Sequence, residues 1–114
     1  MKANHVALSQ GIFYVATGLW PVIHMRSFEA VTGPKQDKWL ARTMGGLIAA
    51  VGAALIAGSF ERRPSRALQV LGIGSALALG AADVIYSTRR TISKVYLGDA
   101  AAEGAIVAGW AATN

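Results

Sequence analysis

The sequence predicts an all-α protein, a transmembrane four-helix bundle with short loops, on three observations. Of its 114 residues, 54% are hydrophobic and only 15% are charged, whereas charged residues make up about 25% of an average soluble domain. The charged residues are segregated into short stretches between long apolar runs. These runs match the length of a membrane-crossing helix, which needs about 20 apolar residues. The composition argues against an ordinary soluble enzyme and against a disordered chain.

Four apolar runs are the candidate spans, and together they predict one integral membrane domain over residues 1–114. The runs are Val6–Met25, Trp39–Phe60, Ala67–Ser87 and Tyr96–Ala112. They lack the alternation of a barrel strand, so the backbone polar groups in lipid must be paired within helices. A soluble bundle would need a polar stripe on each helix, and the second run has none. The fourth run is short and contains Glu103, so whether it crosses fully is left open.

Chain breakers and charges mark the connections between these runs. Gly33-Pro34 lies in the first connection and Pro64 in the second. The segment Arg26–Val31 is too short and too charged to cross a bilayer, and we expect it to form a short interfacial helix. The first run follows a lone Lys2 and is too long for the apolar region of a signal peptide.

Small residues recur at a spacing of four on three of the runs and predict close helix packing. The stripes are Gly46, Ala50, Ala54 and Gly58 on the second run, Gly72, Ala76 and Gly80 on the third, and Gly104, Ala108 and Ala112 on the fourth. Such faces let helix backbones approach closely in lipid. We favour packing within the monomer over homodimerisation, and either arrangement leaves little room for a wide water-filled pore.

The net charge of +5 indicates contact with lipid headgroups and not with nucleic acid. Every Lys and Arg lies in a tail, a connection or the first turn of a run, where basic residues meet headgroup phosphates. No basic stretch is interleaved with aromatics, as single-stranded nucleic acid binding requires. Seven basic residues on the side of the first and third connections, against four on the other, favour those connections in the cytoplasm and both termini outside.

Ionisable residues from all four runs are expected to converge at one leaflet. The cluster consists of His24, Glu29, Arg42, Asp83 and Glu103. An unpaired Asp at mid-span costs about 2.5 to 3.5 kcal/mol on insertion scales, so such residues face the interior and find partners. Two interpretations stay open. The cluster is either a polar clasp that pins the helices in register, or a substrate or proton site with Arg42 as counter-ion to Asp83 or Glu103.

The sequence carries no motif of a catalytic, metal or cofactor site. It has no cysteine, which excludes disulfides, a thiolate nucleophile and Cys-type metal sites. His24 and Glu103 do not stand in a metal-ligand spacing, and a nucleophile elbow, a P-loop and a dinucleotide motif are all missing. We therefore predict a protein that is not an enzyme and that needs no cofactor or metal.

Two stretches of the chain resemble a known group of proteins. They are Thr17–Pro21, which reads TGLWP, followed by Met25–Lys35, which reads MRSFEAVTGPK. These stretches, together with Ala82–Tyr86 and Tyr96–Ala100, resemble small uncharacterised four-span bacterial inner-membrane proteins. In layout alone the chain is similar to DoxX-type four-helix membrane proteins. The resemblance implies a multi-pass location in the bacterial inner membrane and brings no assigned activity.

The favoured function is a non-enzymatic accessory or scaffold subunit. Its expected partners are membrane lipids and a larger membrane complex or a second copy of itself. The alternative is a small transporter or lipophilic-ligand-binding protein that uses the ionisable cluster. Small multidrug transporters share the length and span count, but their chemistry needs a Glu in the middle of the first span, and this first run has no acidic residue. A membrane-embedded isomerase or hydrolase is the least favoured class, because no nucleophile or metal set is evident.

Overall fold

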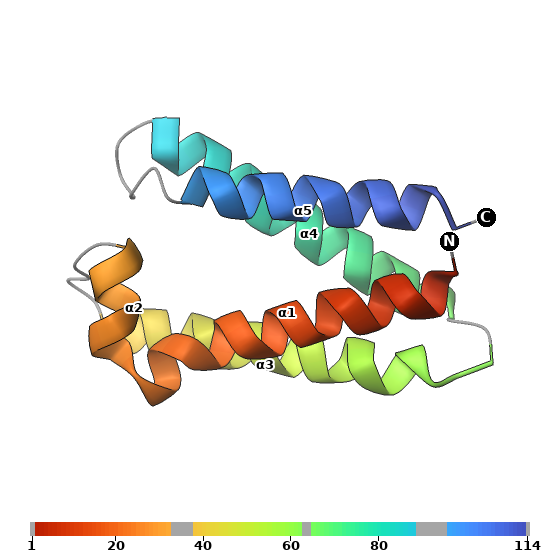
Figure 1. The fold of residues 1–114 in the computed structure, drawn as a ribbon, viewed down its shortest axis with the longest axis horizontal. Coiled ribbons are helices and arrows are strands. Elements are labelled where there is room, and N and C mark those ends of the chain that lie inside the picture. The colour runs from red at the N-terminus through yellow and green to blue at the C-terminus, as the bar shows by residue number, and fades with distance from the viewer. Residues whose placement is uncertain (1, 33–37, 63–64, 89–95, 114) are drawn as a thin grey trace.

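The computed structural model describes residues 2–32, 38–62, 65–88 and 96–113, which form helices and no strands (Figure 1). The helices are α1 (Ala3–Ile23), α2 (Met25–Thr32), α3 (Lys38–Ser59), α4 (Arg66–Thr88) and α5 (Tyr96–Ala111). The all-α class is confirmed. Each predicted run is one helix, with ends within three residues of the prediction, and the short predicted helix at Arg26–Val31 is α2.

Some of the predicted features lie outside the described residues. These are the breakers Gly33, Pro34 and Pro64 and the basic residues Lys35, Arg63, Arg89, Arg90 and Lys94.

Three helices are long and apolar enough to cross a membrane. They are Ala3–Ile23, Lys38–Ser59 and the part of α4 at Arg66–Ile85. The fourth, α5, has 16 residues, so it measures about 24 Å against a hydrocarbon core of about 30 Å. A crossing by α5, and with it the complete four-helix transmembrane bundle, stays a prediction.

The helices pack as two antiparallel pairs, α1 with α3 and α4 with α5 (Figure 1). The contacts between the pairs are far less extensive than those within them. Asn4 ties the first turn of α1 to the end of α3, because its Nδ2 donates to the carbonyl oxygens of Ser59 and Glu61, each at 2.7 Å. Both chain ends lie at this end of the elongated molecule, opposite α2 (Figure 1).

The contact between α1 and α3 is a seam of glycines spaced seven residues apart. Gly11 and Gly18 on α1 lie against Gly52 and Gly45 on α3. A methyl group at Gly52 would come within 2.6 Å of the carbonyl oxygen of Gly11, and one at Gly18 within 2.5 Å of the carbonyl oxygen of Gly45. The two backbones therefore touch directly, as small residues allow in membrane helices.

The four-residue stripe on the same helix is not part of this seam. Gly46, Ala50 and Ala54 lie on the exposed side of α3, and a methyl group at Gly46 would meet nothing within 4 Å. The reason is helical geometry. Residues four apart rotate by about 40° at each step, whereas residues seven apart rotate by only about 20°. For these three residues the expected packing inside the monomer is therefore replaced by Gly45 and Gly52, whereas Gly58, the last residue of the stripe, is buried against Leu68 of α4 as expected.

The contact between α4 and α5 does use the predicted stripe on α4. Gly72 lies beneath the ring of Trp110, and a methyl group at Gly72 would stand 2.7 Å from the ring atoms. Gly80 lies against Glu103. Ala76, between them, is buried. On α5 the facing residues, Glu103 and Trp110, are again seven apart. The predicted α5 stripe, which includes Gly104 and Ala108, is exposed.

Candidate functional site: a buried polar clasp and an acidic cluster

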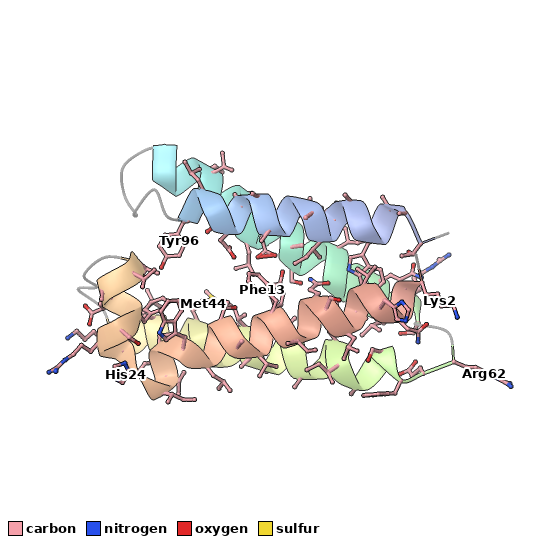
Figure 2. All side chains as sticks on the ribbon, in the orientation of Figure 1. Lys2, Phe13, His24, Met44, Arg62 and Tyr96 are labelled. Atoms are coloured by element: carbon pink, nitrogen blue, oxygen red, sulfur yellow. The ribbon has the colours of Figure 1, made fainter. Side chains whose placement is uncertain are left out.

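Buried polar side chains join α1 to the α4–α5 pair. We call them the polar clasp, and its members are Gln10, Tyr14, Ser75, Glu103 and Trp110. Gln10 and Tyr14 stand one turn apart on α1, and both are completely buried. Glu103 and Trp110 reach them from α5 and are also buried. The clasp lies between the two helix pairs, where Figure 2 also places Phe13 of α1.

Gln10 contacts both helices of the second pair. Its Nε2 donates to the carbonyl oxygen of Gly72 at 2.8 Å and, more weakly, to Ser75 Oγ at 3.4 Å. Its Oε1 accepts a hydrogen bond of 2.8 Å from Trp110 Nε1. The Gln10 amide thus forms hydrogen bonds to both α4 and α5. A buried polar side chain needs such partners, because an unpaired polar group is costly in a low-dielectric environment.

Tyr14 makes the second link of the clasp. Its hydroxyl donates to Glu103 Oε1 at 2.5 Å. The acceptor is a carboxyl group, and hydrogen bonds of this kind are short and strong. The two residues come from α1 and α5, so this bond also joins the two helix pairs.

An acidic cluster continues from the clasp along α4 and α5. We define it as Asp83, Asp99 and Glu103. Asp83 follows Gly80 by three residues, and Asp99 precedes Glu103 by four. Since Gly80 faces Glu103, the antiparallel register brings the other two carboxylates level with each other. Asp99 and Glu103 both interact electrostatically with Asp83.

Asp83 is the unsatisfied member of this cluster. Its residue is only 6% exposed, and its Oδ2 is buried without a hydrogen-bond partner. Within the described ranges the single ion pair joins Lys38 to Glu29, so no described basic side chain neutralises the three carboxylates. Asp83 lies in a helix that is long and apolar enough to cross a membrane, and an unpaired carboxylate in such a helix is a candidate functional site.

The structure separates the five ionisable residues that the sequence grouped: Asp83 and Glu103 lie together, whereas Glu29 and Arg42 line a different space between α2 and α3. Arg42 is exposed on α3 and forms no ion pair with Asp83 in the described part of the chain. Glu29 on α2 pairs with Lys38 Nζ at 3.5 Å. His24 is exposed at the corner between α1 and α2. The predicted five-member cluster is thus divided among three places.

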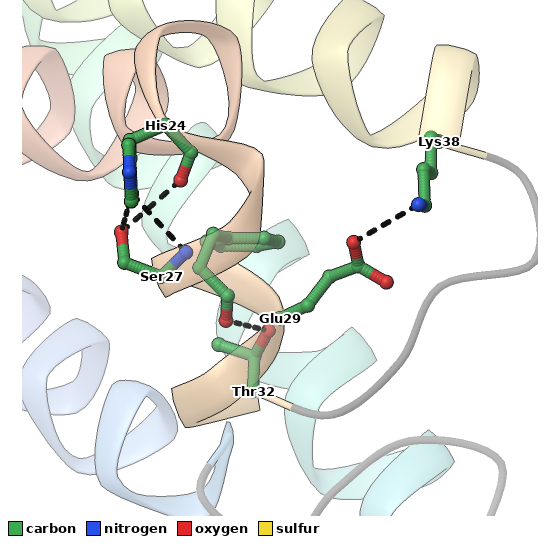
Figure 3. Close-up of polar contacts among 6 residues, drawn as sticks. His24, Ser27, Glu29, Thr32 and Lys38 are labelled. Atoms are coloured by element: carbon green, nitrogen blue, oxygen red, sulfur yellow. Dashed lines mark hydrogen bonds and ion pairs between the residues drawn. The ribbon is translucent and has the colours of Figure 1, made fainter.

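His24 has a structural role at that corner (Figure 3). It precedes α2, and its Nδ1 accepts a hydrogen bond of 3.2 Å from the backbone N–H of Ser27. A side chain that accepts from the third residue of a helix is an N-cap, which satisfies a donor that the helix leaves free. Ser27 Oγ also accepts a 2.8 Å hydrogen bond from Trp20 Nε1, so the corner fixes α2 to α1.

Sequence reasoning missed four residues of the clasp: Gln10, Tyr14, Ser75 and Trp110. The available signal was a spacing of alternating four and three residues. Ala7, Gly11, Tyr14 and Gly18 follow it on α1, and all are buried. This spacing is typical of a seam between two helices, and it places Tyr14 at an interface.

The chemistry open to these groups is narrow. Three carboxylates and a phenol can exchange protons or attract a cation. Among the described residues, no group of three His, Asp or Glu side chains is arranged to hold a metal ion.

Comparison with known proteins assigns the chain to no family. No family model, curated protein or solved structure matches the chain. The resemblance to small four-span inner-membrane proteins therefore stays a prediction, and the functional argument depends on the helices, the polar clasp and the acidic cluster.

Proposed function

We propose that the chain is a multi-pass protein of the bacterial inner membrane that acts as a non-enzymatic accessory or scaffold subunit. The carrying observation is the polar clasp, in which Gln10, Tyr14 and Trp110 direct their polar atoms at other helices. Polar groups committed to interhelical hydrogen bonds hold a bundle in one register. They are not arranged around a substrate.

The exposed surface supports the membrane part of this proposal. Large apolar side chains face outward near the middle of the long helices, for example Ile12 at 56% exposure and Leu77 at 55%. Exposed apolar side chains on helices long enough to cross a membrane are suited to contact with lipid or with another protein. We propose that α5 crosses with the other three helices as the partner of α4, which completes the four-helix bundle.

The partners we propose are lipid and a larger membrane complex or a second copy of the chain. The small residues on the outer faces of α3 and α5 support helix contacts of this type. Ala50 and Ala54 are exposed on α3, and Gly104 and Ala108 on α5. Small residues at a spacing of four drive helix association in lipid.

Affinity purification from mild detergent tests this function. We expect the tagged chain to retain a partner or to form a defined oligomer. The double variants Ala50→Leu/Ala54→Leu and Gly104→Leu/Ala108→Leu each add bulk to one outer face, and one of them should release the partner. Ala81→Leu, at an exposed α4 position, is the matched control. A wild-type chain that is strictly free and monomeric would contradict the proposal.

The unsatisfied Asp83 Oδ2 favours a second candidate, a small transporter or lipophilic-ligand-binding protein. In this version the acidic cluster attracts a lipophilic cation, and neither Arg42 nor His24 takes part. Binding of tetraphenylphosphonium to the reconstituted protein tests it. Asp83→Asn and Glu103→Gln should each reduce binding. Glu61→Gln should not, because Glu61 is an exposed carboxylate after α3, at the other end of the molecule. Unchanged binding with a lower melting temperature for Glu103→Gln would identify the carboxylate as a clasp member only.

A further inference from the structure

A cavity of about 390 Å³ lies between α2 and the first turns of α3, apart from the clasp. Its lining residues are Met25, Arg26, Glu29, Ala30, Lys38 and Arg42. Arg26 and Glu29 are one turn apart on α2, and Lys38 and Arg42 are one turn apart on α3. Two short rows of charged side chains therefore face the same space from two helices.

The charges in this cavity do not balance. Lys38 and Glu29 form an ion pair at 3.5 Å and neutralise each other (Figure 3). Arg26 and Arg42 form no ion pair within the described ranges. The cavity thus keeps two guanidinium groups, one from each helix. Lys38 of the lining lies in the first turn of α3, at the positive end of the helix dipole.

With α3 crossing the membrane as proposed, the cavity lies at the level of the lipid phosphates. The apolar segment long enough to cross a membrane begins at Lys38, which lines the cavity. Trp39, the next residue, is 66% exposed, and an exposed indole at the end of a span is typical of the headgroup region. A ligand in this cavity would stand at the interface between headgroups and acyl chains.

The walls of the cavity are held in place before any ligand binds. The edge of one ring in the Trp20–Phe28 pair meets the face of the other at a centroid distance of 5.4 Å, and Trp20 also donates to Ser27. The His24 cap fixes the first turn of α2. A site that needs little ordering loses less free energy on binding.

We propose that this cavity binds the phosphate of an anionic lipid headgroup, contacted by Arg26 from α2 and by Arg42 from α3. Guanidinium groups match phosphate oxygens with paired hydrogen bonds. This proposal rests on the proposed membrane location, and it adds one specific lipid contact to it.

Native mass spectrometry of the detergent-solubilised chain with added phosphatidylglycerol tests the site. Each basic residue near an anionic lipid contributes about fivefold to affinity, so Arg26→Gln/Arg42→Gln should raise the apparent Kd about thirtyfold. Arg62→Gln/Arg66→Gln removes the same charge at the opposite end and should change the Kd less than about threefold. Phosphatidylcholine should bind weakly to the wild-type chain, and inorganic phosphate at millimolar concentration should not displace phosphatidylglycerol.

Several results would overturn the site. Equal weakening by both double variants would show diffuse attraction of charge, and no weakening by either would show that the cavity is not used. Equal binding of phosphatidylcholine would remove the preference for an anionic lipid, and displacement by inorganic phosphate would identify a soluble anion. Failure of the membrane location itself is a separate result, because a wild-type chain that is soluble without detergent would show it before any lipid is added.

Discussion

Two of the helix interfaces in this molecule are built in different ways. The α1–α3 interface consists of glycines whose backbones touch, with Gly11 against Gly52 and Gly18 against Gly45. The interface between α1 and the α4–α5 pair has fewer contacts and is joined by the hydrogen bonds of Gln10 and Tyr14. Close packing of two backbones specifies the first interface, and hydrogen bonds between polar side chains specify the second. The first should therefore be sensitive to added volume, and the second to loss of a single polar atom.

The largest effect should come from adding a methyl group to the glycine seam. In Gly45→Ala the new methyl would collide with the carbonyl oxygen of Gly18, which is backbone and cannot rotate away. Overpacking costs about 1 to 3 kcal/mol and occasionally more, and we expect the upper end for a backbone collision. Thermal unfolding in detergent measures the loss.

Gly46→Ala is the matched control for this substitution. It lies one residue further along α3, where a methyl group would meet nothing within 4 Å. Alanine favours a helix over glycine by about 1 kcal/mol, so this variant should be at least as stable as the wild type. Equal destabilisation by both variants would contradict the described seam.

A smaller effect should follow from replacing Gln10, which joins three helices. Gln10→Leu keeps the volume but removes the acceptor of Trp110 Nε1 and the 2.8 Å hydrogen bond to the carbonyl oxygen of Gly72, which still accepts from Ser75 Oγ. Interhelical hydrogen bonds in membranes contribute about 0.6 kcal/mol on average and up to about 1.7, so the loss should be about 1 to 2 kcal/mol. Gln69→Leu, at an exposed site on α4, should change the melting temperature little. A Gln10 variant as stable as the wild type would show that the clasp does not hold the pairs.

Tyr14→Phe should weaken the second link of the clasp by less. The substitution removes only the hydroxyl that donates to Glu103, so we expect about 0.5 to 1.5 kcal/mol. A double-mutant cycle with Glu103→Gln isolates the pair, because the two losses should be less than additive. Strictly additive losses would show that the two side chains are not coupled.

The smallest effect on stability is expected at Asp83. Its Oδ2 has no hydrogen-bond partner, so Asp83→Asn removes no bond at that atom and should keep the melting temperature close to that of the wild type. Asparagine can still hydrogen-bond to Asp99, so a large loss of stability would show that the Asp83 carboxylate has a further structural partner, and would weaken the case for a cation at this cluster.

The sequence predicted the helices well and their faces poorly. Apolar runs determine where a helix in lipid begins and ends, so Tyr96 marks the first residue of α5 in both the prediction and the structure. Which face of a helix is buried depends on small rotations. The prediction used a spacing of four, which includes Gly46. Residues seven apart rotate less around the helix axis, and the α1–α3 contact follows this spacing through Gly45 and Gly52.

The candidate site was predicted only in part for a related reason. Depth along a helix can be counted from the sequence, and Asp83 and Glu103 do lie in one region. Direction around the helix axis cannot be counted in the same way, and Arg42 is exposed on α3 and forms no ion pair with either carboxylate in the described part of the chain. His24 was grouped by depth, whereas in the structure it is the N-cap of α2, a position for which histidine is not among the preferred residues.

Cysteine accessibility in intact membrane vesicles tests most directly whether lipid surrounds these helices. The chain has no cysteine, so single variants can be labelled without background. Leu77→Cys, at an outward position of α4 with 55% exposure, should resist a membrane-impermeant maleimide in vesicles and react once detergent is added. Arg62→Cys, in the connection between α3 and α4, should react whenever its side of the membrane is accessible. Rapid labelling of Leu77→Cys in sealed vesicles would show that water and not lipid covers this face, and would contradict the membrane assignment.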